Sequence, residues 1–257
     1  MISPKTSVSS RSATVAPKFV VLLPPSEGKA LGGEKKLSWR TSAGAFGKSL
    51  SRQRQQVVDA LTHAHGGSQA LLGVSGDHLK RAQTANTQLV GAPTLPAWER
   101  YTGVVWDHLD IASLTATQRA RAMNSIVVVS GLHGLVTAAD PIPDYRLKMG
   151  ARLAPLGSLT AWWRDTITTA LHAYAKNAVI IDLLPNEHRG AIKWESLPRV
   201  MRVDLIAKKG GRAGGHNAKA AKGELARHII CAGSTAASAQ SSISTFRHAD
   251  FSAKVAS

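Results

Sequence analysis

Three continuous apolar runs constrain the fold of this chain more than any other feature. They read FVVLL, IVVVS and AVIIDLL, at Phe19–Leu23, Ile126–Ser130 and Ala178–Leu184. Short runs that are rich in β-branched residues and apolar on both alternating faces are typical of strands covered on both sides. A fourth run, Val200–Ala207, alternates apolar and polar residues at its centre, which predicts a strand nearer to the edge of the sheet.

Helical segments lie between these runs, at Leu50–His63, Thr117–Asn124, Leu159–Tyr174 and Ala218–Ile230. Strands interleaved with helices predict a mixed α/β (α+β) fold, a single compact domain around a central mixed sheet with helices packed around it. We expect this domain to span residues 18–232. The Ser/Thr-rich residues 1–17 and the Ala/Ser-rich residues 233–257 are expected to be disordered tails.

The chain is strongly basic, with 32 Lys and Arg against 16 Asp and Glu and a formal net charge of +16 over 257 residues. Without residues 1–17 and 232–257, 28 basic residues still face 15 acidic ones, so the folded part itself is basic. Such an excess attracts polyanions and favours nucleic acid as the partner. A cationic surface that serves only solubility is the alternative.

The single cysteine, Cys231, excludes an internal disulfide and a multi-cysteine metal site, and its apolar surroundings predict a buried structural residue. No apolar run approaches the roughly 20 residues that cross a bilayer. The N-terminal residues lack the apolar stretch of a secretory signal. We therefore expect a cytoplasmic protein with no membrane partner, no metal and no cofactor.

The first strand runs into the turn PPSEGKALGG, and a strand followed by Gly and Lys is how phosphate loops begin. A Walker loop needs a glycine at the position of Leu23 and a Ser or Thr at the position of Ala30, so this turn is not that of a P-loop NTPase. Backbone N–H groups, Ser26 and Lys29 could still hold an anion. A proline-stiffened turn with a solvated lysine is the alternative.

The segment Leu72-Gly73-Val74-Ser75-Gly76 comes close to the Gly-apolar-Gly turn of a helix-hairpin-helix, with one additional residue between the glycines. Such a turn grips a phosphate of duplex DNA with its backbone N–H groups. We expect Asp77 to cap the next helix, which would present His78, Lys80 and Arg81. Contacts of this kind read the DNA backbone and not its sequence. An ordinary helical connection with a basic face is the alternative.

Two segments that leave buried strands are rich in polar residues. Ser130–Leu153 offers Asp144, Tyr145 and Arg146, in the kind of long connection where sites are often built. His133 lies in it and is read as a structural hydrogen-bonding residue. The third run ends in Asn186, Glu187, His188 and Arg189, at a strand end where α/β sheets usually bind ligands. The adjacent Glu187 and His188 cannot face the same way on a regular element, which argues against a metal site.

The last basic segment, Ala207–Ile229, mixes glycines with lysines and arginines before a predicted helix. A flexible cationic loop that leads into a helix N-terminus is a good phosphate binder. Lys219 and Lys222 are three residues apart and share a helix face, whereas Lys222 and Arg227 do not.

An ordered set of motifs over about Val20–Ile230 resembles the YaaA family of peroxide stress proteins: PPSEGK, the YTG at 101–103, SGLHG, DYRLKMG, the Asn186-Glu187 strand end and AKAAKGELAR. The resemblance implies a mixed α/β fold with a positively charged cleft and a helix-hairpin-helix. It also implies binding of double-stranded DNA and a role in limiting iron-driven oxidative DNA damage. The positions that match the family motifs are Ser26, Lys29, Tyr101, Gly103, Ser130, Gly131, Gly134, Tyr145, Arg146, Gly150, Lys219, Lys222 and Gly223. The sequence departs from the family in the glycine-rich insertion Gly210–Gly215, in the additional hairpin residue and in His133, where an aromatic residue is usual.

The preferred interpretation is a sequence-nonspecific protein that binds double-stranded DNA. It requires that the cations gather along a single groove. The residues expected to contact phosphates are Ser26, Lys29, Gly73, Gly76, Lys80, Arg81, Arg146, Lys219, Lys222 and Arg227.

The alternative is an enzyme, a hydrolase or transferase acting on a nucleotide or nucleobase. Its pocket at the strand ends would be built from Ser26, Lys29, Tyr101, Arg146, Asn186 and Glu187. Glu187 or Glu27 would serve as acid–base, with Lys29 and Arg146 holding phosphate and Tyr101 as a further candidate catalytic group. A deep pocket that encloses a carboxylate of raised pKa would favour this alternative.

Overall fold

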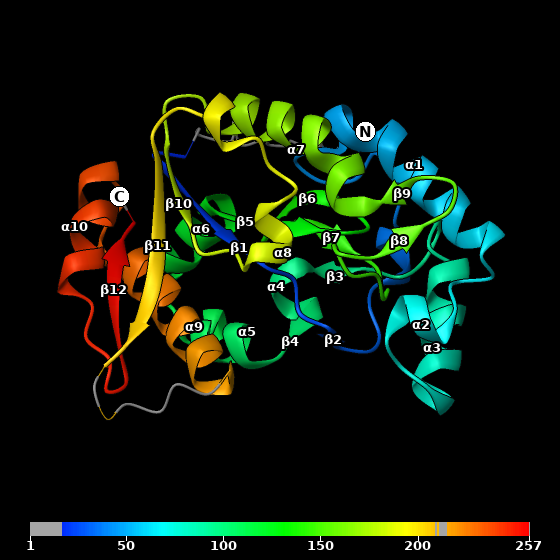
Figure 1. The fold of residues 1–257 in the computed structure, drawn as a ribbon, viewed down its shortest axis with the longest axis horizontal. Coiled ribbons are helices and arrows are strands. Elements are labelled where there is room, and N and C mark those ends of the chain that lie inside the picture. The colour runs from blue at the N-terminus through cyan, green and yellow to red at the C-terminus, as the bar shows by residue number, and fades with distance from the viewer. Residues whose placement is uncertain (1–16, 209, 211–214, 257) are drawn as a thin grey trace, which may run out of the picture.

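The computed structural model describes residues 17–208, 210 and 215–256. The expected N-terminal tail, apart from residue 17, and most of the glycine-rich insertion therefore lie outside the described residues. Six strands form the central sheet in the order β12-β11-β10-β1-β5-β6 (Figure 1). Their bounds are β1 Phe19–Leu23, β5 Ile126–Ser130, β6 Gly134–Thr137, β10 Val179–Asp182, β11 Val200–Ala207 and β12 Phe251–Val255.

The four central strands β11, β10, β1 and β5 are parallel, and the outer strands β6 and β12 pair antiparallel to their neighbours. Every residue of β1, β5 and β10 is buried, as their continuous apolar sequences predict. The alternating strand β11 lies next to the edge, also as predicted. Three two-stranded pairs flank the sheet: β2 Gly28–Lys29 with β4 Tyr101–Thr102, β3 Leu95–Pro96 with β7 Pro141–Ile142, and β8 Arg152–Leu153 with β9 Gly157–Ser158.

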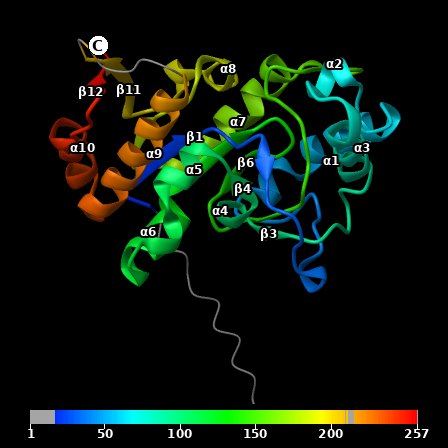
Figure 2. The ribbon, with the colours of Figure 1, turned by 90° about the horizontal axis from the view of Figure 1, so that it is seen from below.

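Helices cover both faces of the sheet, as a parallel sheet requires. Helices α1 and α7 lie on one face, and α5, α6 and α9 lie on the other (Figures 1 and 2). The helices are α1 Gly47–His63, α2 Gln69–Leu72, α3 Gly76–Thr87, α4 Ala97–Arg100, α5 Val104–Leu109, α6 Ala116–Ser125, α7 Leu159–Ala175, α8 Asn186–Arg189, α9 Gly215–Ala232 and α10 Ala236–Thr245, with single 3-10 turns at Lys35–Leu37, Ile111–Ser113 and Trp194–Ser196.

The C-terminal end differs from the sequence-based expectation of a disordered tail over 233–257. Residues 236–245 form α10, which begins with a capping box at Thr235, and β12 pairs with β11 from Val203↔Val255 to Ala207↔Phe251. Four apolar side chains in the described part of this Ala/Ser-rich segment are buried, namely Ala239, Ile243, Phe246 and Phe251. These few residues anchor the segment to the sheet edge although its average composition is that of a tail.

Cys231 also differs from expectation, because its side chain is exposed near the end of α9 and not buried. Its neighbours Ile229 and Ile230 are the residues that face the core. The apolar run HIICAG was therefore a correct sign of a core-facing helix but did not place the cysteine on the buried face.

Candidate functional site: a cationic cleft at the strand ends

A cleft of about 830 Å³ lies beyond the carboxyl ends of the parallel strands, where ligands commonly bind in α/β sheets. The segments that follow β1, β4 and β10 form part of its lining, together with residues 145–148 and the first turns of α9. Its polar and charged lining residues are Ser26, Glu27, Lys29, Thr102, Asp107, Tyr145, Arg146, Lys148, Glu187, His188, Lys219 and Lys222.

The cleft brings together residues that sequence analysis proposed from four separate segments. Five of the ten predicted phosphate-binding residues line it: Ser26, Lys29, Arg146, Lys219 and Lys222. Both proposed acid–base carboxylates, Glu27 and Glu187, line it as well. Tyr101 lies just behind the lining residue Tyr145, whereas Asn186 does not line the cleft.

A second hollow of about 300 Å³ adjoins the first and shares Glu27, Lys29 and Arg146 with it. Its outer wall comes from the α2–α3 region, through Val74, His78 and Arg81. The predicted hairpin therefore borders the same surface as the cleft.

Two other residues predicted to contact phosphates, Lys80 and Arg227, line neither hollow. Lys80 is exposed and pairs with Asp77 at 3.4 Å. Arg227 donates hydrogen bonds to the carbonyl oxygens of Leu109 (3.0 Å) and Asp110 (2.6 Å). Its guanidinium thus fastens α9 to the end of α5, which is a packing role and not a place in the cleft.

The α2–α3 connection consists of two helices joined by a short turn. Gly73 ends α2 in the left-handed conformation with φ 64°, and Gly76 begins α3 with φ 56°. Both positions favour glycine, because other residues enter this region only with strain. The cap position of α3 is Ser75 and not Asp77 as expected; Asp77 lies in the first turn. Neither glycine lines the cleft, and the turn lies beside it.

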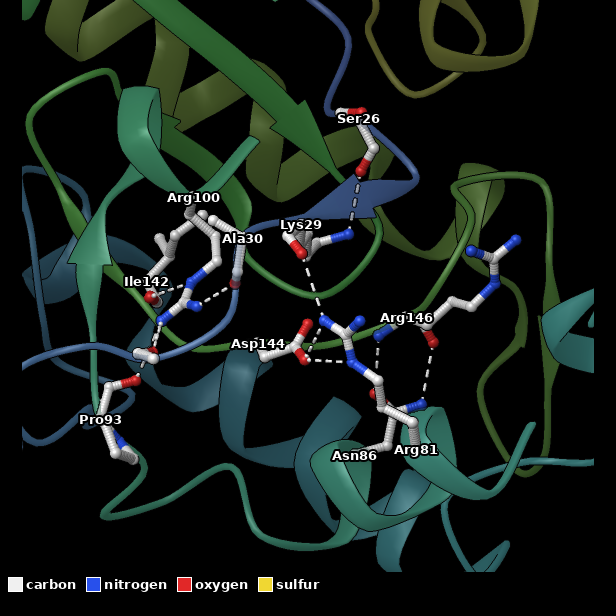
Figure 3. Close-up of polar contacts among 11 residues, drawn as sticks. Ser26, Lys29, Ala30, Arg81, Asn86, Pro93, Arg100, Ile142, Asp144 and Arg146 are labelled. Atoms are coloured by element: carbon white, nitrogen blue, oxygen red, sulfur yellow. Dashed lines mark hydrogen bonds and ion pairs between the residues drawn. The ribbon is translucent and has the colours of Figure 1, made fainter. Parts of the chain in front are cut away.

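Lys29 is the lysine at the centre of the site. Its Nζ donates a hydrogen bond to the carbonyl oxygen of Ser26 at 2.9 Å (Figure 3). The same nitrogen lies 4.1 Å from the ring centroid of Tyr145 and 5.7 Å from that of Tyr101. Among the described residues, no carboxylate comes within ion-pair distance of Lys29. Although the residue as a whole is only half-buried, desolvation of its ammonium lowers the pKa of Lys29 to about 7, against the weaker opposing effects of Asp144 and Glu27.

The two tyrosines form a neutral wall behind that ammonium. The hydroxyl of Tyr145 lies 2.8 Å from the hydroxyl of Tyr101 and 2.8 Å from Ser130 Oγ. Burial raises the pKa of Tyr145 to about 12 and the pKa of Tyr101 well above its usual value. Both phenols therefore stay protonated at neutral pH, and neither supplies a negative charge to the lysine.

His133, read from the sequence as a hydrogen-bonding residue, packs with its ring instead. Its ring stands edge-to-face against Tyr145 (4.9 Å between centroids) and Trp39 (5.3 Å). Neither ring nitrogen has a partner in the described chain, and burial holds the pKa of His133 well below its usual value. The imidazole is therefore neutral and lies outside the lining of the cleft.

Arg146 connects the cleft to the hairpin. One guanidinium nitrogen pairs with Glu27 at 2.6 Å, while Nε donates to the carbonyl oxygen of Leu72 at the end of α2 (2.9 Å). Lys148 also pairs with Glu27, at 3.3 Å. Desolvation raises the pKa of Glu27, but Lys148 and Arg146 together outweigh this effect and lower it. Glu27 is therefore ionised at neutral pH.

Two side chains of α3, Arg81 and Asn86, fix this helix to residues 144–146 and to Lys29 (Figure 3). Arg81 pairs with Asp144 at 2.8 Å and donates to the carbonyl oxygen of Lys29 at 3.2 Å. The buried Asn86 accepts a hydrogen bond from the Arg146 N–H (2.9 Å) and donates one to the Arg146 carbonyl oxygen (2.8 Å). These contacts hold α3 against the site.

On the far side of the cleft, Glu187 accepts a hydrogen bond from the Gly150 N–H at 2.6 Å. A Cβ at position 150 would lie 2.9 Å from Glu187 Oε1, so glycine permits this approach. Desolvation lowers the pKa of Lys222 to about 8, and Arg189 adds to the effect. Burial likewise lowers the pKa of His188 to about 4, so this imidazole is neutral.

The family model for the peroxide stress protein YaaA matches residues 19–256 of the chain. The chain belongs to the YaaA family. A UPF0246 protein of Streptomyces coelicolor is 36% identical to it over 221 residues, which cover 84% of each chain. A UPF0246 protein of Corynebacterium glutamicum is 34% identical over 217 residues, covering 81% of this chain and 84% of the relative. One from Roseobacter denitrificans is 29% identical over 183 residues, covering 64% and 69%.

Membership of the YaaA family supports a role in peroxide stress. The matched region reaches Ala256 and so includes α10 and β12, which sequence analysis had left outside the domain. No group of three or more His, Cys, Asp or Glu side chains in the described residues could hold a metal ion. Along the same residues, no helix has the length and apolarity that crossing a bilayer requires.

Sequence reasoning noticed Tyr145, Lys148 and His188 as members of polar segments but did not include them among the predicted site residues, although all three line the cleft of this YaaA-family protein. The first two lie in the DYRLKMG motif beside the predicted Arg146, so the motif itself was the available signal. His188 adjoins the predicted Glu187, but its burial depends on packing that the sequence does not display.

Proposed function

We propose that this YaaA-family protein binds double-stranded DNA through the sugar–phosphate backbone, without sequence preference, as part of the peroxide stress response that limits iron-mediated DNA damage. The observation that carries the proposal is the gathering of Lys29, Arg146, Lys148, Lys219 and Lys222 around one cleft. Five cations converging from three chain segments produce a local positive potential that attracts phosphates. The adjoining hairpin would seat a second part of the backbone.

The size of the cleft refines the proposal. A volume of about 830 Å³ suits a ligand the size of a nucleotide and is too small for a duplex. We infer that the duplex lies across the mouth of the cleft and the adjoining hollow, and that one nucleotide turned out of the helix would fill the cleft. Flipped nucleotides are bound in this way by proteins that act on individual sites in DNA.

A salt titration of duplex binding tests the proposal. Fluorescence anisotropy with a labelled duplex should show log affinity falling with log salt by about 0.9 for each phosphate contacted. Lys219→Ala/Lys222→Ala should reduce that slope by about two and weaken binding by about tenfold or more for each lysine. The control Lys18→Ala/Lys193→Ala removes two lysines that do not line the cleft and should bind like the unsubstituted protein.

A salt-independent affinity, or a cleft variant indistinguishable from the control, would refute backbone binding at this site. Parallel titrations with single-stranded and branched DNA would show which form of DNA the surface prefers.

A second candidate function, an enzyme acting on a nucleotide or nucleobase, is favoured by the lowered pKa of Lys29 in a pocket that also holds Glu27 and Glu187. A carboxylate of raised pKa would have favoured it further, but the pKa of Glu27 is lowered. Chromatography of nucleosides and nucleoside monophosphates incubated with the protein tests this candidate. Release of free base that Glu187→Gln abolishes would support it, and unchanged substrates would exclude it.

A further inference from the structure

We propose that Lys29 is a nucleophile whose amine condenses with the open-chain aldehyde of a sugar phosphate, such as the sugar left in a DNA strand where a base has been lost, to form an imine. The inference deepens the proposed function and rests on it for the sugar–phosphate character of the ligand. It assigns chemistry to a lysine that backbone binding alone does not require.

The position of Lys29 is the first argument. The side chain lies in the wall that the cleft and the adjoining hollow share. Its only polar partner in the described chain is the Ser26 carbonyl oxygen, which accepts a hydrogen bond from either the ammonium or the amine. An ammonium with a carboxylate partner would be held in its charged form, and Lys29 has none within ion-pair distance.

The protonation state is the second argument. At pH 7 about half of a lysine with a pKa near 7 is free amine, compared with about one part in three thousand at the ordinary pKa of 10.5. Lysines desolvated in this way are the ones that form imines with carbonyl substrates. The charged or titratable groups that act on Lys29 or lie against it are Asp144, Glu27, Arg146, Arg100, Arg81, His133, Tyr101 and Tyr145.

The surroundings identify the electrophile class. Arg146, Lys148, Lys219 and Lys222 line the same cleft as Lys29 and could hold phosphates on either side of a sugar. Apolar residues also line the cleft and would pack against the carbon atoms of a sugar: Pro24, Pro25, Val104, Val105, Trp106, Leu147 and Pro185. A sugar phosphate that carries an aldehyde satisfies both features.

The step needs no oxidant, reductant or metal. The Nζ lone pair forms a bond to the aldehyde carbon, and the C=O π pair moves to the oxygen, which is protonated. Nitrogen then loses its protons as the C–O bond breaks, so that one water leaves and a C=N bond remains. Hydrolysis reverses the step.

Borohydride trapping tests the proposal, because reduction converts the imine into a stable secondary amine. The full-length protein would be incubated with a labelled duplex containing one abasic site, or with free 2-deoxyribose 5-phosphate, in the presence of sodium cyanoborohydride. We expect a covalent adduct whose mass, after proteolysis, maps to Lys29. Its rate should rise with pH to half its maximum near pH 7.

Three variants separate the nucleophile from a structural role. Lys29→Met and Lys29→Arg should each reduce trapping at least tenfold, and the arginine variant keeps the positive charge should the methionine variant fold poorly. Lys18→Met removes a lysine at the other end of β1, outside the cleft, and should trap like the unsubstituted protein. Adduct formation that persists in Lys29→Arg would overturn the proposal by assigning it to another amine.

Anisotropy with an intact duplex in the same preparations keeps the two proposals distinguishable. Duplex binding without any trapped adduct would overturn the imine and leave backbone binding standing. An adduct of 2-deoxyribose 5-phosphate at Lys29, with no affinity for either duplex, would overturn DNA binding and support the imine with a free sugar phosphate as its source.

Discussion

The cations of the cleft and the adjoining hollow fall into two groups that differ in how their charge is balanced. In the paired group, Arg81 lies 2.8 Å from Asp144, and Arg146 and Lys148 lie 2.6 and 3.3 Å from Glu27. The unpaired lysines are Lys29, Lys219 and Lys222. In the described part of the chain, no carboxylate comes within ion-pair distance of any of these three.

This difference in charge balance gives the two groups different main roles. The paired cations mainly hold structural elements in place, and the unpaired lysines are available to a ligand. The paired cations hold α2, α3, residues 144–148 and the turn after β1 in one arrangement. Two carboxylates face three cations, so one net positive charge remains in this group for a phosphate. The unpaired lysines keep a charge that only a ligand can balance, and two of them, Lys29 and Lys222, have lowered pKa values of about 7 and 8. Groups held in an unfavourable ionisation state are characteristic of functional sites, so the unpaired lysines are where we expect the ligand.

The largest expected effect comes from breaking the scaffold of the paired group. Asn86→Ala would leave the Arg146 N–H and the carbonyl oxygens of Gly66 and Arg146 without their partner in a buried place. The free energy of unfolding, measured by urea denaturation, should fall by about 3 kcal/mol, because each unsatisfied group costs about 1–3 kcal/mol and the site relaxes in part.

Asn124→Ala is the matched control. Asn124 is half-buried on α6, and its side chain donates one hydrogen bond, to the carbonyl oxygen of Ala120. Its loss should change the free energy of unfolding by no more than about 0.5 kcal/mol. Equal effects of the two variants would mean that Asn86 does not anchor the hairpin.

The next largest expected effect is an increase in the free energy of unfolding. Lys29→Met removes an ammonium that folding desolvates, so at pH 6 the variant should be more stable than the unsubstituted protein, by about 2 kcal/mol. This is less than the full pKa shift would give, because the side chain keeps some contact with water. The folded-state pKa of about 7 lies below the unfolded value of 10.5, so the unfolded state binds more protons between these pH values. The unsubstituted protein therefore gains stability from pH 7 to 10.5.

The stability gap between Lys29→Met and the unsubstituted protein should accordingly be complete below pH 7 and less than half as large at pH 9. Urea denaturation at pH 6 and pH 9 measures it, with Lys18→Met as a variant that should show no such change. If this difference in the free energy of unfolding stays constant with pH, or if Lys29→Met is the less stable protein at pH 6, then folding does not leave the Lys29 ammonium without a balancing charge, and Lys29 does not belong with the unpaired lysines.

The outline of the fold could be predicted because the sequences of the central strands show that both of their faces are buried. β1, β5 and β10 are covered on both faces, so their sequences carry no polar alternation. β6 was not predicted, because its four residues begin at Gly134 inside a segment read as a long connection. α10 and β12 were missed for a similar reason, since a few buried side chains in an Ala/Ser-rich segment do not change its composition.

The site could be predicted only as a set of residues. Ser26, Lys29, Arg146, Lys219 and Lys222 stand out by their place at strand ends or in a basic helix start, and the cleft confirms that they gather. Their electrostatics could not be predicted. The wall beside Lys29 joins Tyr101 to Tyr145, 44 residues apart. The lowered pKa of Lys29 and the Arg146–Glu27 pair likewise depend on desolvation and three-dimensional contacts that spacing does not reveal.

Within the unpaired lysines, Lys222 should make DNA affinity depend on pH. With a pKa of about 8 it is mostly charged at pH 7 and about one-tenth charged at pH 9 in the free protein. Duplex affinity at constant ionic strength should therefore fall by up to about tenfold more between these pH values than it does in Lys222→Arg, whose guanidinium stays charged. Anisotropy titrations give, for each of the two proteins, the ratio of its duplex affinity at pH 7 to its duplex affinity at pH 9. Equal ratios would show that Lys222 does not meet the phosphates.

The smallest expected effect belongs to the most exposed ion pair of the paired group. Lys148 pairs with Glu27 where the two side chains are 43% and 61% exposed, so Lys148→Met should change the free energy of unfolding by no more than about 0.5 kcal/mol. The pKa of Glu27 should nevertheless rise, because the charge of Lys148 is the strongest of the effects that lower it. An NMR titration of the Glu27 carboxyl carbon measures that shift.

Lys193→Met is the control for this prediction. It breaks the Lys193–Asp165 pair, whose lysine is 43% and aspartate 75% exposed, and should leave the pKa of Glu27 unchanged. An unmoved Glu27 in Lys148→Met would mean that Arg146 alone balances this carboxylate and that Lys148 belongs with the unpaired lysines. A loss of more than about 1 kcal/mol in Lys148→Met would contradict the small contribution expected of an exposed pair.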